Sequence, residues 1–223
     1  KTGDNSDIAN SANVIVLAVK PQVMRNVCRE LAADLGDRKV LLVSIAAGIT
    51  TAHLESWFGE SAAIVRCMPN TPALVGMGAS GLFANSAVTE EQKQLAQKVI
   101  SAVGFVTWVD ADSDIDIVTA VSGSGPAYFF LFMEAMQATA QEMGLNEDLA
   151  RALTYHTAAG AAALAQYSED DIATLRRNVT SPGGTTEQAI LQFEDGDLRG
   201  LVAKALKAAR TRSVELAKET EST

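Results

Sequence analysis

The sequence predicts a doubly wound α/β sheet followed by an all-helical domain. Its first half alternates near-continuous apolar runs with helical patterns, and its second half reads as helices. Unbroken apolar runs are typical of parallel strands covered on both faces. Strand–helix repetition at this spacing indicates a doubly wound sheet. We therefore expect an α/β domain over residues 1–110 and an all-helical domain over residues 111–223.

The predicted α/β domain consists of apolar runs, expected to be strands, separated by helical patterns. Its first apolar runs are Ala12–Pro21, Lys39–Gly48 and Ser61–Asn70, and the helical patterns between them are Gln22–Leu35 and Thr51–Phe58. The same pattern continues through the segments Gly78–Asn85, Glu90–Val103 and Gly104–Asp110. Ligands of such sheets lie outside the carboxyl ends of the strands. Those ends are small, polar or proline-containing here, which suits either a flat ligand or ordinary turns.

The second half differs in composition and is rich in alanine. Its helical patterns are Ser124–Met143, Asn146–Tyr167, Ser168–Arg177, Thr186–Phe193 and Asp197–Lys218. Small residues such as those in "HTAAGAAALAQ" allow helices to approach closely. A tightly packed helical assembly is the expected result.

Composition excludes several classes of protein. The formal net charge of -9 argues against nucleic acid and anionic membrane as partners. No uninterrupted apolar run reaches the roughly 20 residues of a membrane span, and no secretory signal is visible. Cys28 and Cys67 follow no metal or redox spacing, so we interpret both as reduced residues of a cytosolic protein. We expect structural roles for His53, on a surface helix, and for His156, in the helical bundle, and we expect no metal site.

The sequence shows no G-x-G-x-x-G phosphate loop. The glycines of "GMGASG" (Gly76–Gly81) do not join a strand to a helix with the right flanks. In a dinucleotide-binding fold that loop follows the central strand. We therefore expect a further β-α-β unit, roughly 40–50 residues long, ahead of Lys1.

The stretch "NVTSPGGTTEQA" (Asn178–Ala189) places two adjacent glycines before a helical pattern. Glycines let the backbone turn sharply and leave its N–H groups uncovered. A helix that begins at Thr185 or Thr186 would point unpaired N–H donors at that turn, where an anion is attracted. The alternative is a helix cap with a glycine turn.

Linked motifs resemble one family. The segments "AVKPQ", "SIAAGIT", "RCMPNTPALVGMG", "VSGSGPAY" and "SPGGTT" stand in the order and spacing of the pyrroline-5-carboxylate reductases. The resemblance implies a Rossmann-like domain followed by an all-helical dimerisation domain. It also implies hydride transfer from NAD(P)H to 1-pyrroline-5-carboxylate, the last step of proline biosynthesis. A cytoplasmic homodimer or ring of dimers follows from the resemblance, with NADP(H) favoured over NAD(H) and neither nucleic acid nor membrane as partner.

The same resemblance implies roles for individual residues. The hydroxyl of Thr186 would meet the ring nitrogen of the substrate, and Glu169 would lie near the substrate amine. The substrate carboxylate would be held by the Ser181 hydroxyl and by the amides of Gly183, Gly184 and Thr185. The residues expected to contact the cofactor are Asn5, Ala18, Val19, Lys20, Pro21, Ile45, Ala46, Ala47 and Asn178. The loop Met68–Pro72 is expected to wall the site, and "SGSGPAY" to line the junction of the domains.

Other functions remain alternatives at this point. One is an NAD(P)-dependent dehydrogenase of the hydroxyacid type with a helical second domain. Such an enzyme needs a lysine base near the nicotinamide, and the strip Phe129–Met143 contains no lysine. The other alternative is a non-catalytic helical scaffold.

Overall fold

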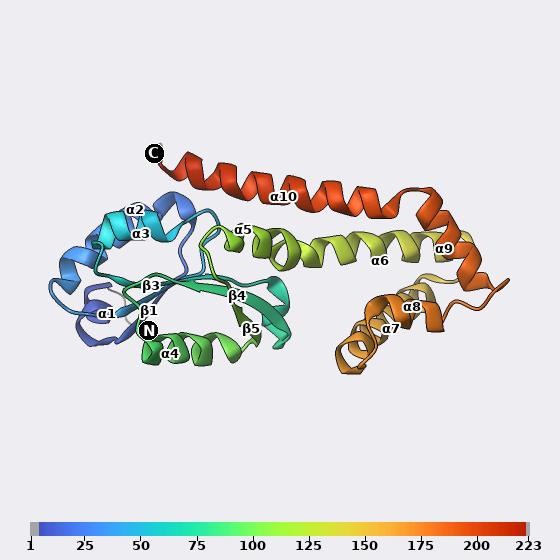
Figure 1. Ribbon diagram of the computed structural model, residues 1–223, viewed down its shortest axis with the longest axis horizontal. Coiled ribbons are helices and arrows are strands. Elements are labelled where there is room, and N and C mark those ends of the chain that lie inside the picture. The colour runs from blue at the N-terminus through green and yellow to red at the C-terminus, as the bar shows by residue number, and fades with distance from the viewer. Residues whose placement is uncertain (1–4, 222–223) are drawn as a thin grey trace. The chain divides into compact units, whose positions relative to one another are not determined.

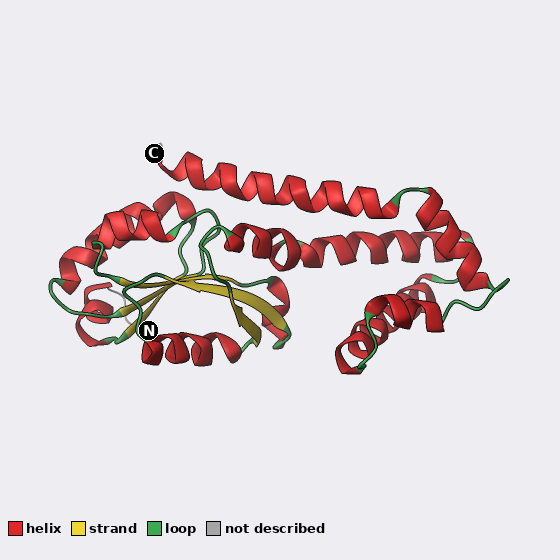
Figure 2. Ribbon diagram, viewed as in Figure 1, coloured by secondary structure: helices red, strands yellow, loops and turns green. Residues whose placement is uncertain are grey.

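The computed structural model describes residues 5–221, so residues 1–4 of the expected first domain lie outside the described part. A five-stranded sheet in the order β1-β2-β3-β4-β5 organises the first half of the chain, and Figure 2 shows that the strands are confined to this half. The strands are β1 (Val14–Leu17), β2 (Leu41–Ser44), β3 (Ala63–Met68), β4 (Gly78–Ala84) and β5 (Gly104–Trp108). Each predicted run contains its strand, and the residues in excess form the flanking turns.

The strand directions confirm the first part of the expected sheet and correct the second. β1, β2 and β3 are mutually parallel, as are β4 and β5. β4 runs antiparallel to β3, although the sequence pattern was interpreted as a continued parallel sheet. The reason is the short connection, a 3₁₀ turn η1 (Thr71–Val75) in place of a crossover helix. Parallel neighbours need a crossover of a dozen or more residues, whereas a short link returns the chain antiparallel.

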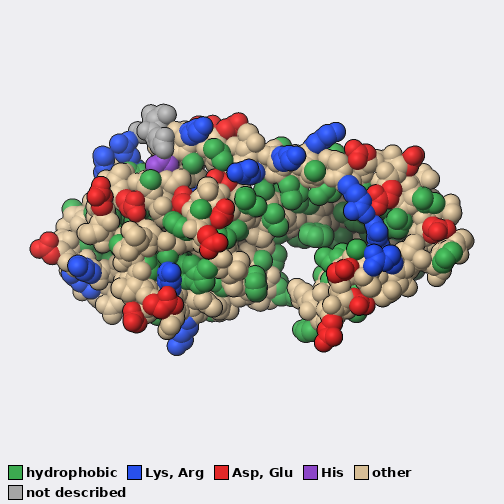
Figure 3. Space-filling view, viewed as in Figure 1, with side chains coloured by type: hydrophobic (Ala, Val, Ile, Leu, Met, Phe, Trp, Pro, Cys, Tyr) green, Lys and Arg blue, Asp and Glu red, His purple; other side chains and the backbone are tan. Residues whose placement is uncertain are grey.

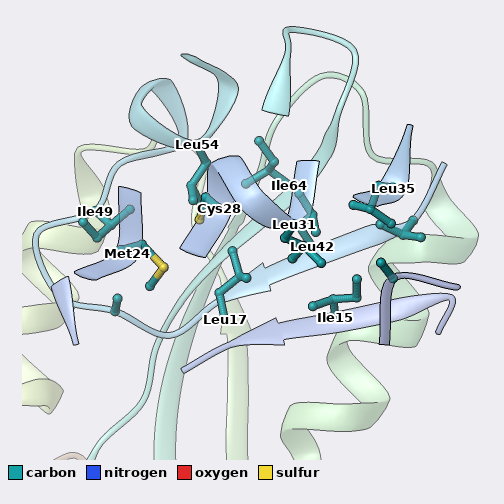
Figure 4. Packing of buried hydrophobic residues seen from close by; sticks show 13 residues of the cluster. Ile15, Leu17, Met24, Cys28, Leu31, Leu35, Leu42, Ile49, Leu54 and Ile64 are labelled. Carbon is teal, nitrogen blue, oxygen red and sulfur yellow. The ribbon is translucent and has the colours of Figure 1, made fainter. Parts of the chain in front are cut away.

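Helices cover both faces of the sheet, as Figure 1 shows. The helices of the sheet region are α1 (Asn5–Ser11), α2 (Pro21–Leu35), α3 (Thr51–Phe58), α4 (Glu90–Ser101) and α5 (Asp114–Val118). In Figure 4, Met24, Cys28 and Leu31 of α2 point toward the strand side chains. On the other face Ala96 and Ile100 of α4 pack in a second buried cluster with residues of β2, β3 and β4. Burial on both faces explains the unbroken apolar runs.

The rest of the chain is helical. Its elements are the π-helix η2 (Thr119–Gly123) and the α-helices α6 (Gly125–Glu142), α7 (Glu147–Tyr167), α8 (Ile172–Asn178), α9 (Thr185–Asp195) and α10 (Leu198–Glu221). The chain forms two compact units, one of residues 1–126 with 206–223 and one of residues 127–205. The last part of α10 therefore belongs to the same unit as the sheet. The functional domain boundary after residue 110 stays a prediction.

His53 caps α3, in line with the expected structural role. Its side chain is buried, although Ala52 and Ser56 of the same helix are exposed. Its backbone N–H donates to Thr50 Oγ1 at 3.2 Å, and its Nδ1 accepts from the Thr50 N–H at 3.2 Å. Its ring also stacks on Trp57, with 6.0 Å between centroids. Here histidine takes the place that glutamate or glutamine usually holds in a capping box, which explains its burial. His156 is exposed on α7.

The helical unit exposes large apolar side chains along α6. Phe129, Phe130 and Leu131 are each at least 60% exposed, and Figure 3 shows hydrophobic side chains open on this surface. By length and composition alone, the helical stretch Asp114–Glu142 is apolar enough to cross a membrane, since an 18-residue window of it has a mean hydropathy of 1.3. Polar residues interrupt the stretch, so it contains no long unbroken apolar run. An apolar surface of this extent marks an interaction site.

Candidate functional site

The carboxyl edge of β1 and β2 presents small, open residues. Ala18, Val19 and Lys20 follow β1 and are exposed. Lys20 has extended backbone at the N-cap of α2, and Pro21 stands in the first turn. Proline there has the φ value that a helix start needs and lacks only an N–H that would be unpaired anyway. The sequence "VKP" therefore ends the strand and starts the helix while leaving the lysine side chain in solvent.

The loop after β2 is the second part of this edge. Ala46 and Gly48 are buried, Ile45 is half-buried and Ala47 is exposed. Gly48 has φ +74, and a Cβ placed on it would lie 3.2 Å from Leu216 Cβ of α10. Only glycine combines this left-handed backbone with so close a neighbour. The edge thus presents small side chains and backbone rather than bulky side chains.

Other residues assigned to the cofactor are distributed over the two units. Asn5 is the first residue of α1, in the sheet unit, and is exposed. Asn178 is the last residue of α8, in the helical unit, and its Nδ2 donates to Asp170 Oδ2 at 3.3 Å. Within the sheet unit, the structure gathers Ala18–Pro21 and Ile45–Ala47 at the carboxyl ends of two adjacent parallel strands.

The loop Met68–Pro72 is joined to the glycine-rich motif. Asn70 Oδ1 accepts from the Ala79 N–H at 2.8 Å, and its Nδ2 donates to the Ser122 carbonyl at 3.0 Å. A Cβ on Gly123 would lie 2.5 Å from Met68 Cε. A side chain on Gly123 would therefore require the flexible end of Met68 to move. The motif forms the π-turn η2, closed by the Ser124 N–H, which donates to the Thr119 carbonyl at 2.8 Å. π-turns occur frequently at functional sites.

The doubled glycine lies immediately before α9. The helix begins at Thr185, as expected, and Gly184 is its N-cap without a side-chain cap. Gly183 has φ +72, so the turn uses the freedom of glycine. Ser181 is exposed, and Thr186 is half-buried in the first helical turn. The amides of that turn have no acceptor within the helix.

Two of the amides assigned to a substrate carboxylate have acceptors within the turn. The Gly184 N–H donates to the Ser181 carbonyl at 3.0 Å. The Gly183 N–H donates to Glu187 Oε2 at 2.7 Å, so a carboxylate of the chain itself occupies this donor. The amides of Thr185 and Thr186 remain the outward donors at the helix start. Glu169, just ahead of α8, is exposed in the same unit.

Sequence reasoning missed a buried charged cluster in the sheet unit. Arg66 of β3 is 2% exposed, and its Nη1 lies 2.9 Å from Asp112 Oδ2 while its Nη2 lies 3.7 Å from Asp116 Oδ1. Asp112 Oδ1 accepts from the Thr51 N–H and hydroxyl, and Asp116 Oδ1 accepts from the Ser213 hydroxyl at 2.7 Å. We call these five residues the Arg66 network. An arginine inside an apolar strand run and the acidic stretch "DADSDID" were the available signals.

The fold and its open strand edge define a dinucleotide-dependent oxidoreductase with a helical second part. A family model described as pyrroline-5-carboxylate reductase dimerisation matches residues 112–216. A second, described as NADP oxidoreductase coenzyme F420-dependent, matches residues 1–48. A pyrroline-5-carboxylate reductase of Pseudomonas aeruginosa is 52% identical over 215 residues, covering 96% of this chain and 78% of the relative.

Solved structures agree. That of a pyrroline-5-carboxylate reductase from Coxiella burnetii has a TM-score of 0.93 at 50% identity, covering 97% of this chain and 80% of that chain. One from Plasmodium falciparum with NADP bound has a TM-score of 0.88 at 31% identity, covering 97% of this chain and 81% of that chain. The chain belongs to the pyrroline-5-carboxylate reductase family. It is an NAD(P)H-dependent oxidoreductase that reduces 1-pyrroline-5-carboxylate to proline and carries a dimerisation domain.

Proposed function

We propose that this reduction takes place at the head of α9, with NADP(H) as the preferred cofactor. The observation that supports the site is the glycine turn that leaves the amides of Thr185 and Thr186 as outward donors beside the exposed Ser181. A helix start with free N–H groups favours a carboxylate, and the substrate carries one. The Plasmodium falciparum relative with NADP bound supports the choice of cofactor.

In this proposal the substrate carboxylate accepts hydrogen bonds from the Ser181 hydroxyl and from amides of the Gly183–Thr185 turn. The Gly184 amide is held by the Ser181 carbonyl and shapes the turn. The Gly183 amide becomes available when Glu187 releases it. Glu169 lies near the substrate amine.

The Thr186 hydroxyl donates or accepts a hydrogen bond at the ring nitrogen and orients the imine. A threonine hydroxyl is too weak an acid to give up its proton outright. The proton therefore comes from water or is already on the iminium nitrogen, whose adjacent carbon is then more electron-poor. Correct placement of the two reactants supplies most of the rate.

The residues that would hold the cofactor are those of the β1 and β2 edge. When bound, NADPH supplies the hydride for the imine carbon. Ala18, Val19 and the Ile45–Ala47 loop offer it an uncrowded surface, and Lys20 and Pro21 border that surface. Asn5 is assigned to the adenosine end, and Asn178 to a contact from the partner subunit. We further propose a cytoplasmic enzyme that assembles as a homodimer or a ring of dimers.

The test is steady-state kinetics of the full-length protein with 1-pyrroline-5-carboxylate and NADPH. Thr186→Ala should lower kcat by about tenfold or more, because it removes an interaction with the reacting nitrogen. Ser181→Ala should raise KM for the imine by about tenfold, the order of one hydrogen bond to a charged group. Ser86→Ala, on an exposed loop of the sheet unit, is the control. If the wild-type protein did not reduce the imine, the proposed function would be refuted. If both variants had the kinetic constants of the control, only the site assignment would be refuted.

The cofactor preference has its own measurement. The kcat/KM for NADPH should exceed that for NADH in the wild-type protein. Equal values, or a preference for NADH, would overturn this part of the proposal and leave the site assignment intact.

A further inference from the structure

The C-terminal part of α10 contacts the loop that follows β2. Gly48 ends the nicotinamide-side loop Ile45–Gly48, and a Cβ on it would lie 3.2 Å from Leu216 Cβ and 3.5 Å from the Leu216 carbonyl carbon. The space into which a Gly48 side chain would project is therefore occupied by α10 at Leu216. A shift of α10 would alter the space in which Gly48 lies.

A second contact holds the far end of the same segment. The Thr51 N–H and hydroxyl donate to Asp112 Oδ1 at 3.3 and 3.1 Å. Asp112 therefore binds the first turn of α3, where a negative charge is favourable. Residues 48–51 lie between these two contacts, and Ile45–Ala47 join them to β2, where the Ile45 N–H donates to the Leu17 carbonyl at 3.1 Å.

Both contacts lead to Arg66. Asp112 is bound by Arg66 through its carboxylate at 2.9 Å and through its carbonyl at 3.2 Å. Asp116 is bound by Arg66 at 3.7 Å and accepts from Ser213 of α10 at 2.7 Å. Ser213 and Leu216 are three residues apart on one helix, so they share a face. A buried guanidinium with two carboxylates allows few arrangements, because each lost partner leaves a charge unpaired.

We infer that Ser213 and Leu216 are positioning residues for the cofactor: they fix the loop Ile45–Gly48 through the Arg66 network. Neither side chain is assigned a contact with substrate or cofactor. The inference rests on the proposed function, because it uses the assignment of Ile45–Ala47 to the nicotinamide side. Binding of the reduced dinucleotide at the sheet edge then depends on the position of α10, which is remote from this edge in the sequence.

The test uses the full-length protein and the variants Ser213→Ala and Leu216→Gly. The second variant removes the Cβ that lies beside Gly48 and is compared with Thr211→Gly. Thr211→Ala is the matched control for Ser213→Ala, since Thr211 is an exposed hydroxyl residue on the same helix. Affinity for NADPH is measured by titration of the cofactor's own fluorescence. Ser213→Ala should weaken it by about tenfold, the order of one hydrogen bond to a charged group. The kcat at saturating NADPH should stay within about twofold of wild type, because the loop acts on binding.

Amide hydrogen exchange of the cofactor-free protein gives a readout that does not depend on activity. Residues 45–51 should exchange faster in Ser213→Ala and Leu216→Gly, while β2 itself keeps its protection. Ser213→Thr, which restores a hydroxyl, should recover NADPH affinity.

The outcomes separate this inference from the proposed function. A wild-type protein that does not bind NADPH would refute the proposed function. A wild-type protein that binds NADPH, with variants whose affinity and exchange match the corresponding Thr211 variants, would overturn only the positioning role. If Ser213→Ala does not fold, Leu216→Gly decides alone, because it removes the Cβ that lies beside Gly48 and leaves the Arg66 network intact.

Discussion

Replacement of Asp112 by alanine should destabilise the sheet unit strongly. The side chain is 27% exposed, yet it accepts from the buried Arg66 and from the first turn of α3. Its loss leaves Arg66 with the distant Asp116 carboxylate at 3.7 Å and the residue 112 carbonyl. Breaking a buried ion pair costs about 3–5 kcal/mol, and partial exposure of Asp112 places the cost at the lower end. We therefore expect a loss of about 3 kcal/mol, which includes the lost interaction at the start of α3.

The assay is urea unfolding at fixed protein concentration, followed by tryptophan fluorescence. Trp57 and Trp108 are the two tryptophans of the chain, and both lie in the sheet unit, so the signal reports on that unit. With a slope of about 2–3 kcal/mol per molar, the midpoint should fall by roughly 1 M urea. Asp110→Ala, an exposed aspartate two residues earlier, is the control and should stay within about 0.5 kcal/mol of wild type. An Asp112→Ala midpoint equal to that of the control would refute the reasoning, since it would mean that Arg66 needs no partner.

Two more predictions concern the core and the helical surface. Burial raises the pKa of Cys28 and of Cys67 to about 12 from an ordinary value near 9, so both thiols should resist labelling at pH 8 until urea unfolds the protein. Because the folded-state pKa values of these thiols are raised, their contribution to stability is complete below pH 9 and is lost as pH rises toward 12. Urea unfolding midpoints measured across this pH range would show that loss. Rapid labelling of the native protein would contradict the burial of the thiols. We expect the exposed apolar side chains of α6, within the dimerisation domain, to form the dimer interface. Phe130→Asp places a charge at a 60% exposed apolar position of this surface, so it should dissociate the dimer and halve the mass seen by light scattering. Ser86→Asp on the sheet unit should leave the mass unchanged, and an unchanged mass for Phe130→Asp would place the interface elsewhere.

The fold was predictable where the signal is local. An unbroken apolar run such as Leu41–Ser44 indicates a strand buried on both faces, and the structure has all four residues buried. The start of α9 followed from Gly183 and Gly184, and it was confirmed at Thr185. The direction of β4 was not predictable from its own residues, because it depends on the length and shape of the connection before it. The π-turn in "VSGSG" was equally hidden, since it depends on Met68 packing against Gly123.

The candidate site divides in the same way. The strand-end segment Ala18–Pro21 and the turn before α9 are contiguous motifs, and each is found in the structure as one local surface. The carboxylate of Glu187 on the Gly183 amide was missed, although the two residues are only four apart. The sequence places Glu187 in the first turn of a helix, but a glutamate there is usually explained by its favourable interaction with the helix dipole alone. Only the geometry shows that it occupies a donor of the proposed anion site.

The Arg66 network explains why part of the site was beyond sequence reasoning. Ser213 and Asp116 are 97 residues apart, and no periodicity links a serine on a late helix to an aspartate after β5. What forces them together is the cost of a buried guanidinium: Arg66 must be neutralised where β3 places it, and the acidic loop after β5 supplies the charges. Asp116 Oδ1, which faces Arg66, also accepts a hydrogen bond from the Ser213 hydroxyl. This bond holds α10 at the position where Leu216 lies beside Gly48. In the proposed positioning role, the geometry of the loop Ile45–Gly48 depends on a charge in the core as well as on the small residues of the loop itself.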